Sequence, residues 1–195
     1  MKPYWTCVVG LLVIVSGCAF APQAVKIKPE PQVATTAAGQ GKSVSVAVID
    51  ERPRKTLGTR GVKGVGAEIG IDGDLPSIVE ESLIRGLRQQ GFTPTSNNPG
   101  EPRQLRAEIR NLDYELLMGF WAGKLRTAFG LKAYCVLGTN RPYERLYLGE
   151  FRESVQVVQG QEANERYINA AVSKALDELF QDSSLTNCLA QDVIP

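Results

Sequence analysis

The sequence predicts a single α+β domain, an antiparallel-rich sheet with two helices packed on one face. A helical pattern follows the first strand-like run, several strand-like runs come next, and a long helical pattern ends the chain. A length of 195 residues suits one domain, which we place at residues 43–190. No internal repeat is visible.

The domain is expected to open with a strand at residues 44–49, a short run in which β-branched side chains dominate. The basic segment that starts at Arg52 ends this strand. Glycines spaced between residues 58 and 70 then predict a loop, with a further strand near residues 67–71.

The first helix is predicted to start after the turn at residues 72–74. Asp74 can accept a hydrogen bond from the backbone of the first turn, and Pro76 is tolerated there. Gly91 favours the end of the helix, because glycine adopts the left-handed conformation at little cost. One face of the helix is apolar: Leu75, Ile78, Val79, Leu83 and Leu87.

Three strands after this helix predict an antiparallel meander. The apolar positions of the first strand are Leu105, Ala107 and Ile109, then Leu112, Tyr114 and Leu116. The change of phase between the two sets predicts a β-bulge near Asn111. The other two strands are expected at residues 124–138 and 144–158, joined by a turn around Pro142.

A second helix near the C-terminus is the most regular pattern in the chain. Its apolar residues repeat at helical spacing, and Leu185 and Leu189 could extend the same packing beyond it. The members of the main stripe are Ile168, Ala171, Val172, Ala175, Leu176, Leu179 and Phe180. This helix is expected to cover the sheet together with the first one.

The first residues predict a lipoprotein signal peptide at residues 1–17. Lys2 gives a positive start, and the apolar run behind it is too short for a membrane-spanning helix. Val15-Ser16-Gly17-Cys18 resembles the lipobox of bacterial lipoproteins, whose cysteine thiol takes a diacylglyceryl group before the leader is cut. Cys18 is therefore the expected lipid attachment site, with an amide-linked chain such as palmitate added. The alternative is an ordinary secretory signal with a chance cysteine.

Residues 18–42 are expected to form a lipidated, flexible tether. Three prolines stiffen its first part, and the run from Thr35 to Gly41 is rich in small residues. A coil of this length would span about 25 to 30 Å between the membrane and the domain. Since no other stretch is apolar enough to span a bilayer, acyl chains are the predicted attachment to the membrane.

The composition limits the classes of binding partner, and the cysteines bear on disulfide formation. The chain has 22 basic and 21 acidic side chains, and loss of Lys2 with the leader makes the two numbers equal, which does not favour nucleic-acid binding. Cys135 and Cys188 remain after processing, in a compartment where disulfides form. These two residues could be bonded to each other or stay as separate thiols.

The chemistry of known catalytic and metal sites is largely missing. The sequence contains no histidine, which excludes Ser-His-Asp and Cys-His catalysis and histidine-based zinc sites. Gly64-Val65-Gly66 lacks the strand–glycine–helix order of a dinucleotide site, and Asp72-Gly73-Asp74 lacks the spacing of a calcium loop. No pair of carboxylates stands out as an acid and a base. We therefore predict no catalytic residue, no metal site and no cofactor.

Two segments are candidate binding sites. Five basic residues near the glycines could contact anionic lipopolysaccharide or peptidoglycan, although a solvated loop is the favoured interpretation. They are Arg52, Arg54, Lys55, Arg60 and Lys63. Residues 116–123 are apolar where a hairpin turn would normally be polar, so Met118, Phe120 and Trp121 could contact a partner or the membrane interface. The favoured alternative is that the strands run longer and bury these side chains.

Five segments, taken together, are typical of one known family. They are Val46–Arg52, Leu57–Arg60, Leu83–Phe92, Leu105–Tyr114 and the last helix running into Asp182. In these segments the chain resembles the YajG-type family of bacterial outer-membrane lipoproteins over nearly its full length. The resemblance implies a small α+β domain without an established biochemical activity. Ala19, which follows the lipidated cysteine, fits the outer-membrane sorting of such lipoproteins.

The predicted function is that of a non-enzymatic lipoprotein on the periplasmic side of the outer membrane. Its domain would bind another envelope protein or assembly. The alternative is a binding module for anionic envelope glycans or lipids, which would use the basic residues of the glycine-rich segment. Salt-sensitive binding to lipopolysaccharide or peptidoglycan distinguishes the second hypothesis from the first.

Overall fold

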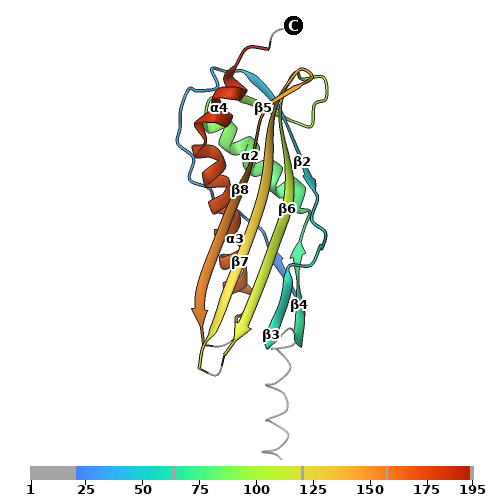
Figure 1. Cartoon of the computed structure of the whole chain (residues 1–195), viewed down its shortest axis with the longest axis vertical. Coiled ribbons are helices and arrows are strands. Elements are labelled where there is room, and N and C mark those ends of the chain that lie inside the picture. The colour runs from blue at the N-terminus through green and yellow to red at the C-terminus, as the bar shows by residue number, and fades with distance from the viewer. Residues whose placement is uncertain (1–20, 63–64, 120, 157, 194–195) are drawn as a thin grey trace, which may run out of the picture.

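The computed structural model describes residues 21–62, 65–119, 121–156 and 158–193 (Figure 1). Within these ranges, three helices accompany a five-stranded sheet of order β5-β2-β6-β7-β8 and a three-stranded sheet of order β1-β4-β3. The strands are β1 Gln23–Lys26, β2 Ser43–Asp50, β3 Gly58–Val62, β4 Val65–Asp72, β5 Thr93–Ser96, β6 Arg103–Met118, β7 Gly123–Leu137 and β8 Asn140–Val155. The helices are α2 Leu75–Gln89, α3 Gln161–Gln181 and α4 Ser183–Ala190. The predicted α+β class is confirmed.

The predicted meander is present as β6, β7 and β8, which pair antiparallel in sequence order. The ladder between β6 and β7 shifts its register between Ile109 and Asn111, where the sequence predicted a bulge. The sequence did not predict the pairing of β2, which lies between β5 and β6 and runs parallel to both. The sheet is therefore mixed, with its long strands antiparallel.

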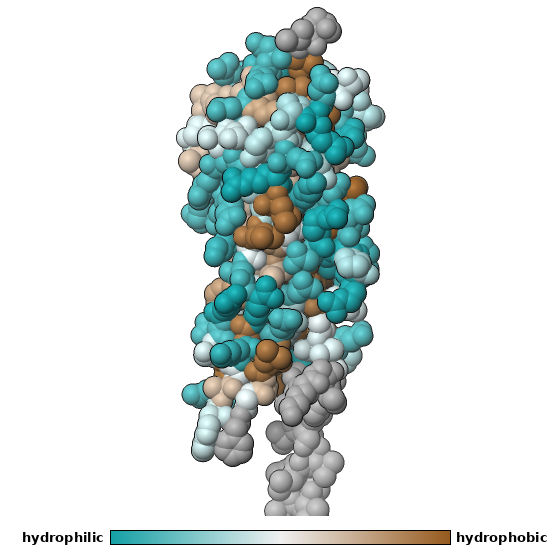
Figure 2. Space-filling model, in the orientation of Figure 1, coloured by the Kyte–Doolittle hydropathy of each residue, from teal (hydrophilic) through white to brown (hydrophobic). Residues whose placement is uncertain are grey.

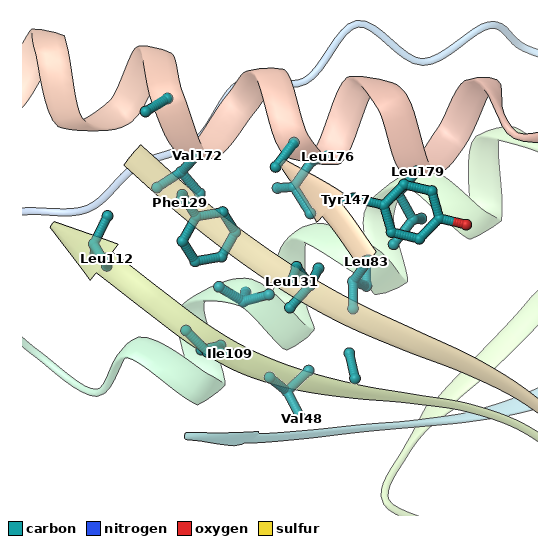
Figure 3. Packing of buried hydrophobic residues seen from close by; sticks show 14 of the residues in the cluster. Val48, Leu83, Ile109, Leu112, Phe129, Leu131, Tyr147, Val172, Leu176 and Leu179 are labelled. Carbon is teal, nitrogen blue, oxygen red and sulfur yellow. The ribbon is translucent and has the colours of Figure 1, made fainter. Parts of the chain in front are cut away.

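The core lies between the five-stranded sheet and the helices, which cover one of its faces (Figures 1 and 3). Ile109 on β6 and Leu131 on β7 are fully buried, as are Leu83 on α2 and Leu176 on α3. Each such side chain stabilises the fold by about 2 kcal/mol through removal of apolar surface from water. The alternating residues of β6 and β7 therefore supply one buried face, and the residues between them supply the other face of the sheet.

Helix α2 begins and ends where the sequence predicted. The Asp74 carboxylate accepts a hydrogen bond from the Ser77 amide at 3.1 Å, which satisfies a free backbone donor of the first turn. Gly91, just after the helix, has a φ of +84°, a conformation that favours glycine. Local rules of capping therefore fix both ends of this helix.

Asp182 connects the end of α3 to the sheet. Its Oδ1 atom accepts from the Ser184 amide at 2.9 Å and so caps α4, while its Oδ2 atom accepts from the hydroxyls of Tyr143 (2.6 Å) and Tyr147 (2.8 Å) on β8. Burial alone would raise the pKa of Asp182, but these donors outweigh it and the net pKa is lowered. This carboxylate is a structural link between the helical layer and β8.

Cys135 and Cys188 are joined by a disulfide in the structure, with Sγ atoms 2.12 Å apart. Cys135 lies on β7 and Cys188 on α4, and both are buried. Of the two interpretations of these cysteines, the structure contains the bonded one. The bond fastens the C-terminal helix to β7, next to the edge strand β8.

Residues 21–42 pack on the domain and are not a flexible tether, which corrects the prediction over this range. β1 pairs in parallel with β4, and Val25 and Ile27 are buried. Further along, the Thr36 amide donates to the Gln89 carbonyl at the end of α2, at 2.9 Å. We call residues 21–42 the strap, because they cross the helical layer from one end of the domain to the other (Figure 1).

The strap is held by a regular series of hydrogen bonds to α3. Amides at every second strap residue donate to side chains at every fourth helix residue. The pairs are Lys26 with Glu165 (3.0 Å), Lys28 with Asn169 (2.6 Å), Glu30 with Ser173 (2.9 Å) and Gln32 with Asp177 (2.6 Å). The two spacings match, because two extended residues advance about 6.6 Å and four helical residues about 6 Å.

This geometry predicts that the strap amides are protected from hydrogen exchange. We expect the amides of Lys28, Glu30 and Gln32 to exchange far more slowly than those of an unstructured peptide, as measured by NMR. Asn169→Ala removes the acceptor of Lys28 and should accelerate exchange there first. If the amides of residues 26–32 were unprotected throughout in the wild-type protein, the packed strap would be contradicted and the flexible tether supported.

Candidate interaction surface

The five-stranded sheet has one face that no helix covers in the part of the chain described. Figure 2 looks onto this face and shows separate apolar patches surrounded by hydrophilic surface. Three large apolar side chains are exposed on it: Ile49 (50%), Leu146 (46%) and Leu148 (54%). We call this surface the open face. Contiguous apolar surface rimmed by polar residues is typical of a protein-binding site, and Leu146 and Leu148 adjoin each other on one face of β8.

Sequence reasoning missed these three residues as site candidates. On β8, Leu146 and Leu148 flank Tyr147, which is fully buried, so they occupy the opposite face of the strand. A strand with one wet face should be polar at these positions. The run Leu146-Tyr147-Leu148, apolar on both faces, was the available signal.

Charged side chains on the open face neutralise one another. The Nζ atom of Lys132 lies 3.2 Å from a carboxylate oxygen of Glu144. The carboxylate of Glu150 forms ion pairs with Arg152, at 2.8 Å, and with Arg126. The hydrogen bonds from Arg152 and Arg126 lower the pKa of Glu150 to about 2. The open face therefore presents charges of both signs without a field of one sign.

A groove of about 290 Å³ adjoins the exposed Ile49 at one end of this face. Its walls come from β2, β6, β7, β8 and the loop after β5, and they include Asn98, Arg106 and Tyr134. The Arg141 guanidinium lies 4.3 Å from the centre of the Tyr134 ring, which holds both side chains at the edge of the groove. A groove lined by amide, aromatic and cationic groups is suited to a protruding protein side chain.

The basic residues predicted to bind anions do not form one exposed surface. Arg52 is only 6% exposed, and its Nε atom lies 2.9 Å from Asp50. Lys55 lies 3.0 Å from the same carboxylate. Burial would raise the pKa of Asp50, but hydrogen bonds from Arg52 and Lys55 prevail and lower it to about 2. Both cations are therefore committed to Asp50, Arg52 as a buried partner and Lys55 as an exposed one.

The remaining basic residues are dispersed. Arg60 is 6% exposed and donates to the Gln159 carbonyl at 3.0 Å. Arg54 is exposed, 3.5 Å from Asp113, and Lys63 lies outside the described residues. The expected glycine-rich loop is instead the hairpin of β3 and β4. Arg52 and Arg60 turn inward because each finds oxygen acceptors there, which sequence spacing alone does not reveal.

The Asp50 cluster predicts how stability depends on pH. The folded pKa of about 2 lies below the ordinary value of 3.8, so the cluster should stabilise the protein fully above pH 3.8 and lose this effect as pH falls toward 2. We expect the melting temperature of the wild type to fall more steeply over this interval than that of Asp50→Asn. The prediction would be contradicted if the melting temperatures of the two proteins fell by equal amounts between pH 4 and pH 2.

The predicted apolar tip is partly exposed and partly buried. β6 extends to Met118 and β7 begins at Gly123, so the strands are long, as the favoured alternative required. Leu116 is buried and Met118 packs against the core, whereas Leu117 is 68% and Trp121 87% exposed. Phe120 lies outside the described residues. We call the described residues 117–119 and 121–123 the β6–β7 tip.

Metal ligands do not cluster in the described ranges, where no group of three or more cysteine, aspartate or glutamate side chains could hold an ion. Within the same ranges, none of the helices combines the length and the apolar character needed to cross a membrane. Cys18, the expected lipid attachment site, lies outside the described residues.

The fold is shared by other solved structures. A candidate neuraminyllactose-binding hemagglutinin homolog from Helicobacter pylori matches with a TM-score of 0.54 at 9% identity, over 86% of this chain and 96% of its own. Protein XCC0632 from Xanthomonas campestris matches with a TM-score of 0.52 at 13% identity, over 86% of this chain and 94% of its own. At such low identity these matches show a common fold alone. No curated protein matches the sequence significantly.

A family model described as "Uncharacterized lipoprotein" matches residues 29–190. The match spans most of the chain and includes both sheets' main strands, all three described helices and part of the strap. It agrees with the resemblance that the sequence motifs indicated. The chain belongs to this family of YajG-like bacterial lipoproteins.

Proposed function

We propose that the chain is a non-enzymatic lipoprotein of the outer membrane, held by acyl chains on Cys18, whose domain binds another envelope protein through the open face. Membership of a lipoprotein family supports the anchor. Ala19 supports the outer membrane, because retention at the inner membrane usually requires aspartate at that position. The observation that carries the proposal is the exposure of Ile49, Leu146 and Leu148 among paired charges.

A protein partner fits the open face better than an anionic polymer does. A polyanion requires cations that can pair with it, whereas Lys132, Arg126 and Arg152 already lie against carboxylates. Apolar side chains between opposite charges match the mixed surface of another protein. The basic residues predicted to bind glycans give no comparable support, since Arg52 and Arg60 are buried.

The carboxylates with shifted pKa values also support a non-enzymatic role. A general acid or base works best with a pKa near neutral pH. The pKa values of Asp50 and Glu150 are instead lowered to about 2 by neighbouring cations. Both groups therefore stay charged at neutral pH and serve as partners of arginine and lysine side chains.

Site-specific photocrosslinking in intact cells tests the binding face. A photoreactive residue at Leu148 should give one adduct of defined mass, and the same residue at Lys174, on the exposed side of α3, should not. Leu146→Glu should abolish the adduct at position 148. The partner identified by mass spectrometry should bind the purified Leu146→Glu lipoprotein at least about ten-fold more weakly than the wild type.

Two results would overturn this function. One is the same adduct from positions 148 and 174, which would indicate contact without a defined face. The other is equal affinity of the purified partner for the wild type and Leu146→Glu. Circular dichroism of the variant provides the folding control, because Leu146 is an exposed side chain and its replacement should leave the fold intact.

A further inference from the structure

The β6–β7 tip and the first described residues lie at the same end of the domain (Figure 1). Gln23 of β1 pairs with Ile69 of β4, and Ile69 pairs in turn with Gly58 of β3. β3 adjoins β6, where the Tyr114 amide donates to the Leu57 carbonyl at 2.8 Å. From Tyr114 the strand continues to Met118 and so runs directly into the tip. Four strands thus connect the strap to the tip.

Arg60 links the same regions through a second route. Its guanidinium donates to the carbonyl of Ala21 at 3.4 Å and to that of Gln159 at 3.0 Å. Gln159 follows β8, whose last residue, Val155, pairs with Gly123 at the base of the tip. The first residue of the strap is therefore fixed next to the segment that supports the tip.

The chain between the strap and the proposed anchor is short. Only residues 19 and 20 separate Cys18 from Ala21, and three successive residues span at most about 11 Å. The strap adds no slack, because residues 23–32 are hydrogen-bonded to β4 and α3. An acyl anchor at Cys18 would therefore bring this end of the domain against the bilayer.

The tip has the chemistry of a membrane interface. Trp121 and Leu117 are the two most exposed large apolar side chains in the described ranges, at 87% and 68%. Lys124, exposed on the next strand, supplies a cation beside them. Tryptophan prefers the boundary between lipid headgroups and acyl chains, where its ring is partly buried and its N–H stays hydrated.

We propose that the β6–β7 tip inserts Trp121 and Leu117 into the phospholipid surface beside the acyl anchor. This inference rests on the proposed anchoring at Cys18. Two contacts with the bilayer hold the domain upright, because α4 and the β7–β8 turn lie at the opposite end (Figure 1). The open face, which runs along the long strands, then points sideways along the membrane toward a partner.

Intrinsic fluorescence tests the contact directly. The chain has 2 tryptophans, Trp5 and Trp121, and cleavage of the leader removes Trp5. The native, full-length mature lipoprotein is purified and reconstituted into phosphatidylcholine vesicles with or without brominated acyl chains, which quench tryptophan at short range. We expect Trp121 emission to be blue-shifted in plain vesicles and to lose most of its intensity in brominated ones.

A matched control moves the tryptophan to the other end of the molecule. Trp121→Phe combined with Thr139→Trp places it in the exposed β7–β8 turn, where emission should be neither shifted nor quenched. Wild-type emission that behaves like this control, in protein shown by mass to be acylated, overturns the membrane contact alone. Emission that is blue-shifted in native envelopes yet unquenched in vesicles also overturns it, since a protein then covers the tip. An unacylated Cys18 overturns both this inference and the proposed anchor.

Discussion

Removal of the Cys135–Cys188 disulfide is expected to lower the free energy of unfolding by about 4 kcal/mol. The two cysteines are 53 residues apart in sequence, so the bond removes much of the conformational freedom of the unfolded chain. Both cysteines are also buried, so water cannot replace the contact that is lost between them. The comparison is between the wild type and Cys135→Ala/Cys188→Ala in urea denaturation.

Reduction provides the control for this prediction. A reductant should lower the urea midpoint of the wild type toward that of the double variant and leave the variant unchanged. A wild type that is insensitive to reductant, together with a double variant of equal stability, would mean that the bond contributes nothing. Loss of the bond should expose α4 first, because α4 is fastened to β7 through Cys188.

Gly149→Ala is expected to destabilise the domain by about 3 kcal/mol. Gly149 lies on β8 where α3 crosses it, and a β-carbon there would come within 1.8 Å of the Ala171 carbonyl oxygen and 2.7 Å of the Ala175 nitrogen. Both are backbone atoms of a helix that cannot move without disturbing the core. The added methyl group must therefore push α3 away from the sheet.

Gly100→Ala is the matched control, because a β-carbon at Gly100 would meet nothing nearer than 3.5 Å. This second variant should be as stable as the wild type, or slightly more stable because alanine restricts the unfolded chain. The measurement is chemical denaturation of the three proteins. Equal stability of Gly149→Ala and Gly100→Ala would show that α3 does not approach β8 as closely as the structure has it.

Elements defined by local rules were predictable from the sequence. The cap at Asp74, the glycine at position 91 and the change of apolar phase near Asn111 each depend on neighbours within a few residues. The long apolar stripe of α3 is of the same kind. These signals predicted the helices, the meander and the bulge, but not the parallel pairing of β2, which depends on strands far away in sequence.

The strap shows where local rules failed. Val25, Ile27 and Val33 alternate with polar residues, which is the pattern of a half-buried extended segment. Pro29 and Pro31 favoured the interpretation as a coil, since proline cannot donate to a sheet. In the structure the amides that donate belong to the residues between the prolines and on either side, and their acceptors are side chains of a helix. No strand propensity scale describes such a partner.

The candidate site was predictable only in part. Trp121 was recognised because an indole at a hairpin turn is unusual, and its exposure agrees with that hypothesis. The exposure of the basic residues was misjudged, because the sequence does not show whether a charged side chain has a hydrogen-bond acceptor inside the fold. Arg52 and Arg60 each find one, and their burial removes the surface that the alternative function required.

Orientation on the membrane links the two proposals. A free tether would let the open face sample every direction, whereas a packed strap and a chain of about 11 Å to Cys18 allow few. A partner with its own membrane anchor would then meet the open face at a fixed height above the bilayer. Binding of the partner then requires less loss of the domain's rotational freedom, which favours the complex.

Mass spectrometry of the mature N-terminus tests the central claim most directly, since the position of the domain depends on the modification of Cys18. The N-terminal peptide of the protein isolated from its native envelope should begin at Cys18 and carry a diacylglyceryl group on sulfur and a fatty acid on its amine. A peptide that begins elsewhere, or a Cys18 without acyl chains, would contradict the anchor and the membrane-facing tip together.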